Sequence, residues 1–133
     1  MNITDDPTLA AMRDQLLQDG LGGECMSLAH VDGVVARISP DESLAAQQEI
    51  VLRSIRTLLD DGLMVVGQIV GGSDERVEPW ALTTEDALAR IHAGYVVHHE
   101  DQAWSFSTWF ALTDGGQRTA IARRRRRPGR SRA

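Results

Sequence analysis

The feature that most constrains the fold is a change in hydrophobic periodicity at Gly62. Before this glycine, apolar residues recur at helical spacing in three segments, which predicts three helices. After it, residues 63–70 are rich in β-branched side chains and bounded by glycines. Residues 104–112 alternate between two faces, with Trp104, Phe106 and Phe110 on the packed face and Trp109 on the opposite one. Both patterns predict strands. Three helices followed by paired strands indicate an α+β fold.

Each of the three helices has a start signal. Asp6 precedes a proline and is suited to cap the first helix, and we expect Ser27 to cap the second. The third signal is the strongest, because Ser39 is followed by proline at the first helical position and by Glu42 three residues later. This arrangement is typical of a reciprocal capping box. It predicts a third helix over residues 39–61.

Two of these helices end in the same pattern, in which two leucines precede a polar pair, a glycine and a third leucine. The glycines are Gly20 and Gly62. In such an ending the residue after the glycine packs back on the last helical turn. We interpret the two copies as shared helix-ending chemistry and not as a repeat, since nothing else in the chain recurs.

The order of the elements resembles a winged helix-turn-helix domain. The Gly-Leu step at 62–63 matches the entry into the first wing strand, and the Leu-Thr-x-x-Gly turn at 112–116 matches the turn after the second. The resemblance covers residues 27–122, and the segments 78–80 and 85–91 are similar to small actinobacterial proteins of this type. It implies three N-terminal helices, a two-stranded β-hairpin and a short C-terminal helix. It also implies a homodimer.

The chain departs from that family in the wing, where residues 71–103 separate the two expected strands. We expect a loop through residues 77–80 and then a helix that begins at Thr83 or Thr84. This helical insertion carries seven acidic residues against two arginines. The third helix, residues 39–61, carries five acidic residues against Arg53 and Arg56. Both elements that would contact DNA in the family, the wing and the third helix, are therefore net acidic.

Charge divides the chain into residues 1–122, predicted to form a single domain, and a basic tail over residues 123–133. All 19 acidic residues lie at or before Asp114, and with seven arginines they leave the domain at −12. The tail holds the other seven arginines, and we expect it to be disordered. Lysine is absent, which is typical of a GC-rich genome and weakens any functional interpretation of the tail.

The acidic domain favours a protein partner, since complementary charge speeds encounter and excludes like-charged competitors. We expect a non-enzymatic binding module with a regulatory or an inhibitor-like, immunity-like role. Trp109 is the candidate anchor because tryptophan is favoured at interface hot spots, and its alternative role is core packing under the inserted helix. The candidate partner-binding residues are Glu78, Trp80, Glu85, Asp86 and Trp109.

The alternative is a DNA-binding transcriptional regulator. In this interpretation Arg53 and Arg56 of the third helix contact phosphates and the tail adds non-specific attraction. The tail could equally be a solvated end, or fold against the acidic domain. The candidate nucleic-acid-binding residues are Arg53, Arg56, Arg123, Arg124, Arg125, Arg126 and Arg127.

Catalytic and metal-binding patterns are weak in this sequence. The run His98-His99-Glu100-Asp101 is interpreted as the polar end of a helix, because adjacent residues rarely ligate one ion together. The single cysteine, Cys25, has no partner for a disulfide or a redox motif. We expect no enzymatic activity, no cofactor and no metal. The N-terminus lacks the pattern of a secretory signal and no span is apolar enough for a bilayer, so we expect a cytoplasmic protein.

Overall fold

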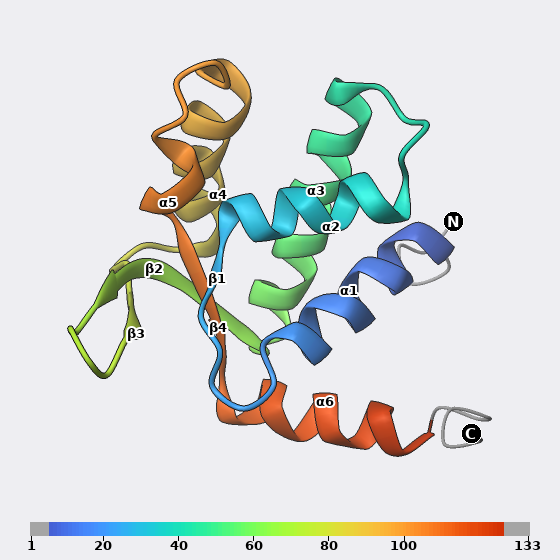
Figure 1. The fold of residues 1–133 in the computed structure, drawn as a ribbon, viewed down its shortest axis with the longest axis vertical. Coiled ribbons are helices and arrows are strands. Elements are labelled where there is room, and N and C mark those ends of the chain that lie inside the picture. Colours follow the sequence, from blue (N-terminus) through green and yellow to red (C-terminus); the bar gives the residue numbers. More distant parts are fainter. Residues whose placement is uncertain (1–5, 127–133) are drawn as a thin grey trace.

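The computed structural model describes residues 6–126 and shows an α+β fold in which helices cover one face of a four-stranded antiparallel sheet (Figure 1). The elements, in chain order, are α1 (Pro7–Asp19), β1 (Met26–Ser27), α2 (Leu28–Ile38), α3 (Leu44–Asp60), β2 (Met64–Val70), β3 (Arg76–Pro79), α4 (Thr84–His92), a π-helix (Ala93–Val97), α5 (Trp104–Ser107), β4 (Trp109–Leu112) and α6 (Asp114–Arg126).

The first two helix starts are confirmed. Asp6 accepts a hydrogen bond from the backbone N–H of Thr8 at 2.9 Å, and Pro7 occupies the first position of α1. Ser27 accepts from the backbone N–H of His30 at 3.1 Å and caps α2. Side-chain oxygens at these positions satisfy N–H groups that have no partner within the helix.

The predicted start of the third helix is wrong. The helix begins at Leu44 instead of residue 39, and its cap is Ser43, which accepts from the backbone N–H of Ala46 at 3.2 Å. Ser39 is not free to cap a new helix because it ends the preceding one, donating its own N–H to the carbonyl of Val35 at 2.8 Å. The capping-box pattern at Ser39 therefore does not start the helix, and a second serine four residues later caps it instead.

The two glycine-terminated helix ends differ from each other. Gly62 has φ +71°, and Leu63 donates to the carbonyl of Leu58 at 3.0 Å, so this end has the left-handed geometry that favours glycine. Gly20 has φ −89° and needs no such freedom. A β-carbon there would lie 2.8 Å from Cγ of Leu112, so close packing against β4 accounts for Gly20.

The sheet is larger than the predicted two-stranded hairpin, because it has four strands in the order β1-β4-β2-β3. β2 confirms the first expected strand and pairs with β4 from Met64 opposite Leu112 to Gly67 opposite Trp109. The predicted loop over residues 77–80 is wrong, since β3 pairs there with the second half of β2. β1 was missed because two residues are too short to show a sequence period.

The second predicted strand is half the expected length. It is confirmed over β4, but the preceding residues form α5, so Trp104 and Phe106 do not share a strand face. The physical reason is that Trp104 packs into an aromatic cluster within the insertion. Its indole N–H donates to the carbonyl of His99 at 2.9 Å, and its ring lies 4.9 Å from that of Tyr95.

The last predicted helix is confirmed as α6, which runs along α1 (Figure 1). It continues to Arg126, past the point where we expected the disordered tail to begin. Arg123 forms an ion pair with Asp14 of α1, which fixes that helical turn against the domain. Residues 127–133, including Arg127, lie outside the described part of the chain.

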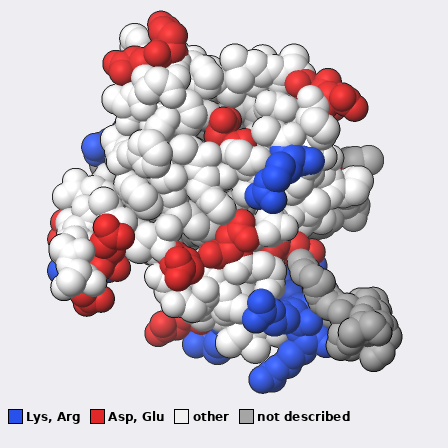
Figure 2. Space-filling view, viewed as in Figure 1, with Lys and Arg blue, Asp and Glu red and all other residues white. Residues whose placement is uncertain are grey.

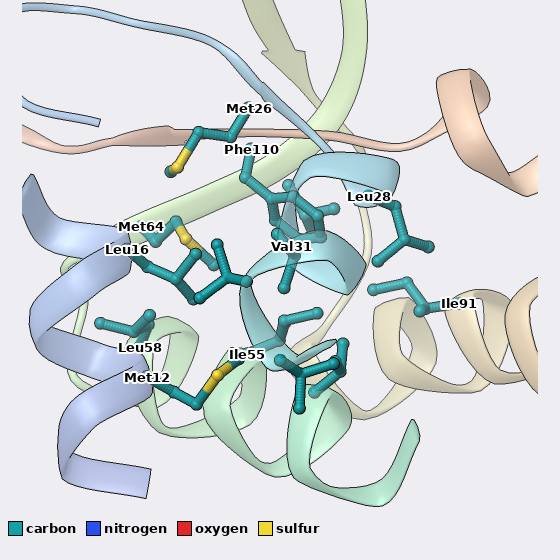
Figure 3. Packing of buried hydrophobic residues seen from close by; sticks show 14 of the residues in the cluster. Met12, Leu16, Met26, Leu28, Val31, Ile55, Leu58, Met64, Ile91 and Phe110 are labelled. Atoms are coloured by element: carbon teal, nitrogen blue, oxygen red, sulfur yellow. The ribbon is translucent and has the colours of Figure 1, made fainter. Parts of the chain in front are cut away.

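One hydrophobic core joins the helices to the sheet (Figure 3). Three adjacent strands each place a large apolar side chain on the same face of the sheet, namely Met26, Val66 and Phe110. Burying one such side chain contributes about 1.5–3 kcal/mol. The helices contribute residues that include Met12, Leu16, Leu28, Val31, Ile55, Leu58 and Ile91.

Candidate partner-binding surfaces

The outward side of α3 lies beside α4 of the insertion. Glu85, in the first turn of α4, accepts hydrogen bonds from both terminal nitrogens of the Arg56 guanidinium, one of them at 3.1 Å. This hydrogen bond, together with the positive charge of Arg56, lowers the pKa of Glu85 below its usual value. Arg53 lies 4.0 Å from Glu49, one turn earlier on α3. Both arginines proposed to contact DNA therefore already have a carboxylate partner.

A shallow groove of about 290 Å³ separates α3 from α4. Leu52, Leu88 and Ala89 provide its apolar lining. Its charged and polar lining consists of Glu49, Arg53, Arg56, Glu85 and His92. The two carboxylates offset the two guanidinium groups, so the groove does not present a basic surface to a phosphate backbone.

Trp80, one of the predicted partner-binding residues, is half-buried and packs against the core. The guanidinium of Arg90 lies 4.1 Å from the centre of its ring, in cation–π geometry. Its indole nitrogen is buried and has no hydrogen-bond partner among the described residues. The side chain is therefore covered from within the chain and offers little area to a partner.

The acidic candidates Glu78, Glu85 and Asp86 are all exposed, but they do not form one site. Glu78 on β3 lies opposite Gln68, whose side-chain amide donates to it at 3.4 Å. Glu85 is taken up by Arg56. Asp86 lies in the N-terminal turn of α4, where its backbone N–H donates to the Thr83 hydroxyl.

Trp109 lies on the face of the sheet opposite the core. Its neighbour Phe110 is fully buried, and successive side chains of a strand point to opposite faces. The Trp109 indole N–H donates to the backbone carbonyl of Phe106 at 2.8 Å, and the two rings lie 6.3 Å apart. The predicted anchor is half-exposed and belongs to an aromatic pair.

Phe106 was missed by the sequence reasoning, which assigned it to the packed face of a strand. Its side chain is 68% exposed, more than any other large apolar side chain among residues 6–126. The signal that could have found it is the run of small polar residues around it, which is unusual for a central strand. An exposed phenylalanine beside a half-exposed tryptophan is a pattern of interaction surfaces.

Half-buried apolar residues continue from this pair across the sheet. The register places Val65 opposite Ala111, and Ile69 opposite Val77, on the same face as Trp109. We call this set the outer sheet face, and it comprises Val65, Ile69, Val77, Phe106, Trp109 and Ala111. The buried side chains of the helices belong to one cluster with Met26, Val66 and Phe110, which point to the opposite face of the sheet.

Carboxylates stand at the other end of the outer sheet face. Cys25 precedes β1, and its thiol lies 3.9 Å from the backbone carbonyl of Glu75. Partial burial raises the pKa of the Cys25 thiol, and the negative charges of Glu75 and Glu24 raise it further. Glu24 directly precedes Cys25 in the chain, so Glu24 and Glu75 both belong to segments that meet at this thiol.

Positive charge is concentrated on α6. On the face drawn in Figure 2 the largest group of arginine atoms lies at the bottom, over α6, while acidic atoms are spread over the rest. Arg118, Arg124 and Arg125 are exposed on this helix, whereas Arg123 is paired with Asp14. Arg126 is its last residue. The candidate basic residues of α3 and α6 thus belong to separate surfaces.

Within residues 6–126, no group of three or more His, Cys, Asp or Glu side chains is arranged to hold a metal ion. The helices of the same range are too short or too polar to cross a membrane. His98 is the cap residue at the end of the π-helix, so the run that begins there does lie at a helix end, as predicted. No protein-family model, curated protein or solved structure matches the chain.

Proposed function

We propose that this chain is a non-enzymatic acidic binding module that acts through a protein partner, as a regulator or as an inhibitor of the immunity type. The observation that carries the proposal is the contact between α4 and α3. Glu85 holds Arg56 with two hydrogen bonds, and Glu49 accompanies Arg53. The helix that would have to enter a DNA groove is flanked by the insertion and has no unpartnered arginine in this pair.

We further propose a winged-helix-like fold whose wing is interrupted. The support is that β2 and β4 pair directly, although β3, α4 and α5 lie between them in the chain. β1, between α1 and α2, pairs with the other edge of β4. Removing the insertion from this order would leave three helices, a hairpin and a C-terminal helix.

Electrostatics favours a protein over DNA as the partner of the folded domain. Affinity for a nucleic acid comes largely from cationic side chains that neutralise phosphates and release counterions. Residues 1–122 carry −12, and the two arginines of α3 lie among Glu49 and Asp60 of the same helix and Glu85 of α4. A basic protein surface would meet attraction where a phosphate backbone would meet repulsion.

The second candidate, a DNA-binding regulator, is favoured by one observation, the exposed arginines of α6. A helix with Arg118, Arg124 and Arg125 on its surface can neutralise phosphates. Such contacts give non-specific affinity but no base readout. Sequence-specific binding would still require α3, whose arginines are engaged.

Titration of a labelled mixed-sequence duplex, at two salt concentrations, separates the two functions. The variants are Arg53→Ala with Arg56→Ala, and the full chain with every arginine from Arg124 onward changed to Gln. We expect weak, salt-sensitive binding that is lost with the second variant and unchanged by the first. Tight binding that survives the second variant and is lost with the first would establish the regulator and overturn the protein-binding proposal.

A further inference from the structure

We propose that the outer sheet face is the docking site, and that its occupant is a basic amphipathic segment of another protein. The inference rests on the proposed function and deepens it by naming the surface and the chemistry of the partner. The feature that points to it is a gradient along this face, from exposed aromatic rings at one end to carboxylates at the other.

The aromatic end is formed by Phe106 and Trp109. Phe106 is 68% exposed, and Trp109 is held beside it by the hydrogen bond from its indole N–H to the Phe106 carbonyl. This bond satisfies the one polar atom of the indole, so a partner can bury the ring without leaving an unpaired donor. Rings fixed in this way offer large apolar area at low conformational cost.

The acidic end is formed by Glu24 and Glu75, next to Cys25. Glu24 directly precedes Cys25, the Cys25 thiol lies 3.9 Å from the backbone carbonyl of Glu75, and both glutamates are exposed. Cys25 directly precedes β1, in which Ser27 is opposite Trp109. At about 3.4 Å per residue, Cys25 lies roughly 7 Å further along the sheet than Trp109.

This spacing defines the partner. In a segment that places apolar side chains on the aromatic rings, residues about two positions further along a strand, or one to two turns further along a helix, would lie over the carboxylates. Arginine or lysine at those positions would pair with Glu24 and Glu75, and a cation over the rings adds cation–π attraction. An acidic segment of the same shape would meet repulsion.

The chain contains a surface with the same chemistry, and it must be tested as a rival occupant. Arg118, Ile121 and Arg125 form one exposed stripe of α6, and Ile121 is 40% exposed. We assign the outer sheet face to another protein because α6 is already docked on α1 through the Arg123–Asp14 pair.

The experiment uses the uniformly ¹⁵N-labelled full chain and two synthetic helical peptides. One peptide has a leucine stripe flanked by arginines, and the other has glutamate at each arginine. The indole N–H signals of the three tryptophans report the site directly, because Trp104 is buried, Trp80 is half-buried against the core, and only Trp109 is on the outer sheet face. The basic peptide should shift the Trp109 signal, and the acidic peptide should leave all three unchanged.

Two variants locate the binding energy. Phe106→Ser should weaken the basic peptide about tenfold, as expected for loss of an aromatic hot spot. Leu44→Ser is the matched control, because Leu44 is 52% exposed on α3 and far from the sheet in sequence, and it should leave the affinity unchanged. Glu24→Gln with Glu75→Gln should weaken binding and reduce its dependence on salt.

Three outcomes would overturn this inference. They are equal binding of both peptides, shifts confined to the α3–α4 groove or α6, and concentration-dependent self-association that disappears with Ile121→Ser. Each of these leaves the protein-binding function standing, which fails only in the duplex titration described above. The two proposals can therefore fail separately.

Discussion

The outward side of α3 and the outer sheet face are both exposed, but they differ in what their side chains still lack. On α3 the charged groups find partners within the chain, as Arg56 does with Glu85. On the sheet the rings of Phe106 and Trp109 lie beside each other and are otherwise open to solvent. The difference teaches that exposure alone does not identify a binding surface. Only on the outer sheet face would a partner remove apolar area from water.

The insertion produces this difference. It supplies α4, which pairs with Arg56 of α3, and it leads directly into α5, which carries Phe106. Tyr95 of the π-helix fixes the insertion in place. Its hydroxyl donates to Asp32 of α2, and its backbone carbonyl accepts from the side-chain amide of Gln48 on α3 at 3.0 Å.

The largest expected effect comes from breaking the sheet under the outer face. In Gly67→Ala the new β-carbon would lie 1.9 Å from the backbone oxygen of Glu78, so β3 would have to move away from β2. We expect a loss of about 3 kcal/mol in the free energy of unfolding, measured by urea denaturation.

Gly33→Ala is the matched control for that substitution. Gly33 lies in the interior of α2 with nothing within 4 Å of the position of the new methyl group. Alanine there should stabilise the chain by about 0.5–1 kcal/mol. Equal losses at Gly33 and Gly67 would contradict the tight β2–β3 contact.

The next effect concerns the attachment of the insertion. Tyr95→Phe removes the hydrogen bond to Asp32 and should cost about 2 kcal/mol of unfolding free energy. Asp32→Asn is the control, since an amide oxygen still accepts the bond. A Tyr95→Phe chain as stable as the parent would show that the insertion is held by packing alone.

The same tyrosine predicts a dependence on pH. Burial, the hydrogen bond to Asp32 and the charge of Asp32 raise the pKa of Tyr95 above its usual value of 10.0. A raised pKa contributes stability that is present below pH 10 and is lost as the pH rises beyond it. Because Tyr95 is the only tyrosine, its ultraviolet absorbance reports ionisation directly. Half-ionisation of the folded chain at or below pH 10 would contradict the buried contact.

The smallest effect is at the acidic end of the outer sheet face. Since burial and then Glu75 and Glu24 raise the pKa of Cys25, its alkylation by iodoacetamide at neutral pH should be slower than that of a free thiol. Glu75→Gln should speed the reaction only in part, because burial is the larger cause. An unchanged rate in that variant would place the carboxylate away from the thiol.

Local signals in the sequence were sufficient for the helix starts at Asp6 and Ser27 and for the strand that follows Gly62. In each case a side-chain oxygen or a glycine acts within a few residues, so neighbours in the sequence decide the outcome. The helix expected to begin at Thr83 or Thr84 follows the same principle, since it begins at Thr84 with Thr83 as its cap. Trp109 was correctly singled out as a residue facing away from the core.

The misassigned elements depend on contacts between distant residues. Ser39 had the sequence of a cap, yet its backbone was needed at the end of α2. Phe106 fitted an alternating strand, but Trp104 packs against His99 and Tyr95, and the residues around Phe106 form the short helix α5. The pairing of Arg56 with Glu85 could not be predicted from a local pattern either, because 29 positions separate the two residues.

The central claim is that this chain binds a protein through the outer sheet face and does not read DNA through α3. Site-specific photo-crosslinking in the cells that make the protein tests it most directly, with the reactive residue placed at Phe106 in one strain and at Arg53 in another. We expect a discrete protein adduct from position 106 and no nucleic-acid adduct from position 53. A nucleic-acid adduct at position 53, with no protein adduct at position 106, would contradict the account.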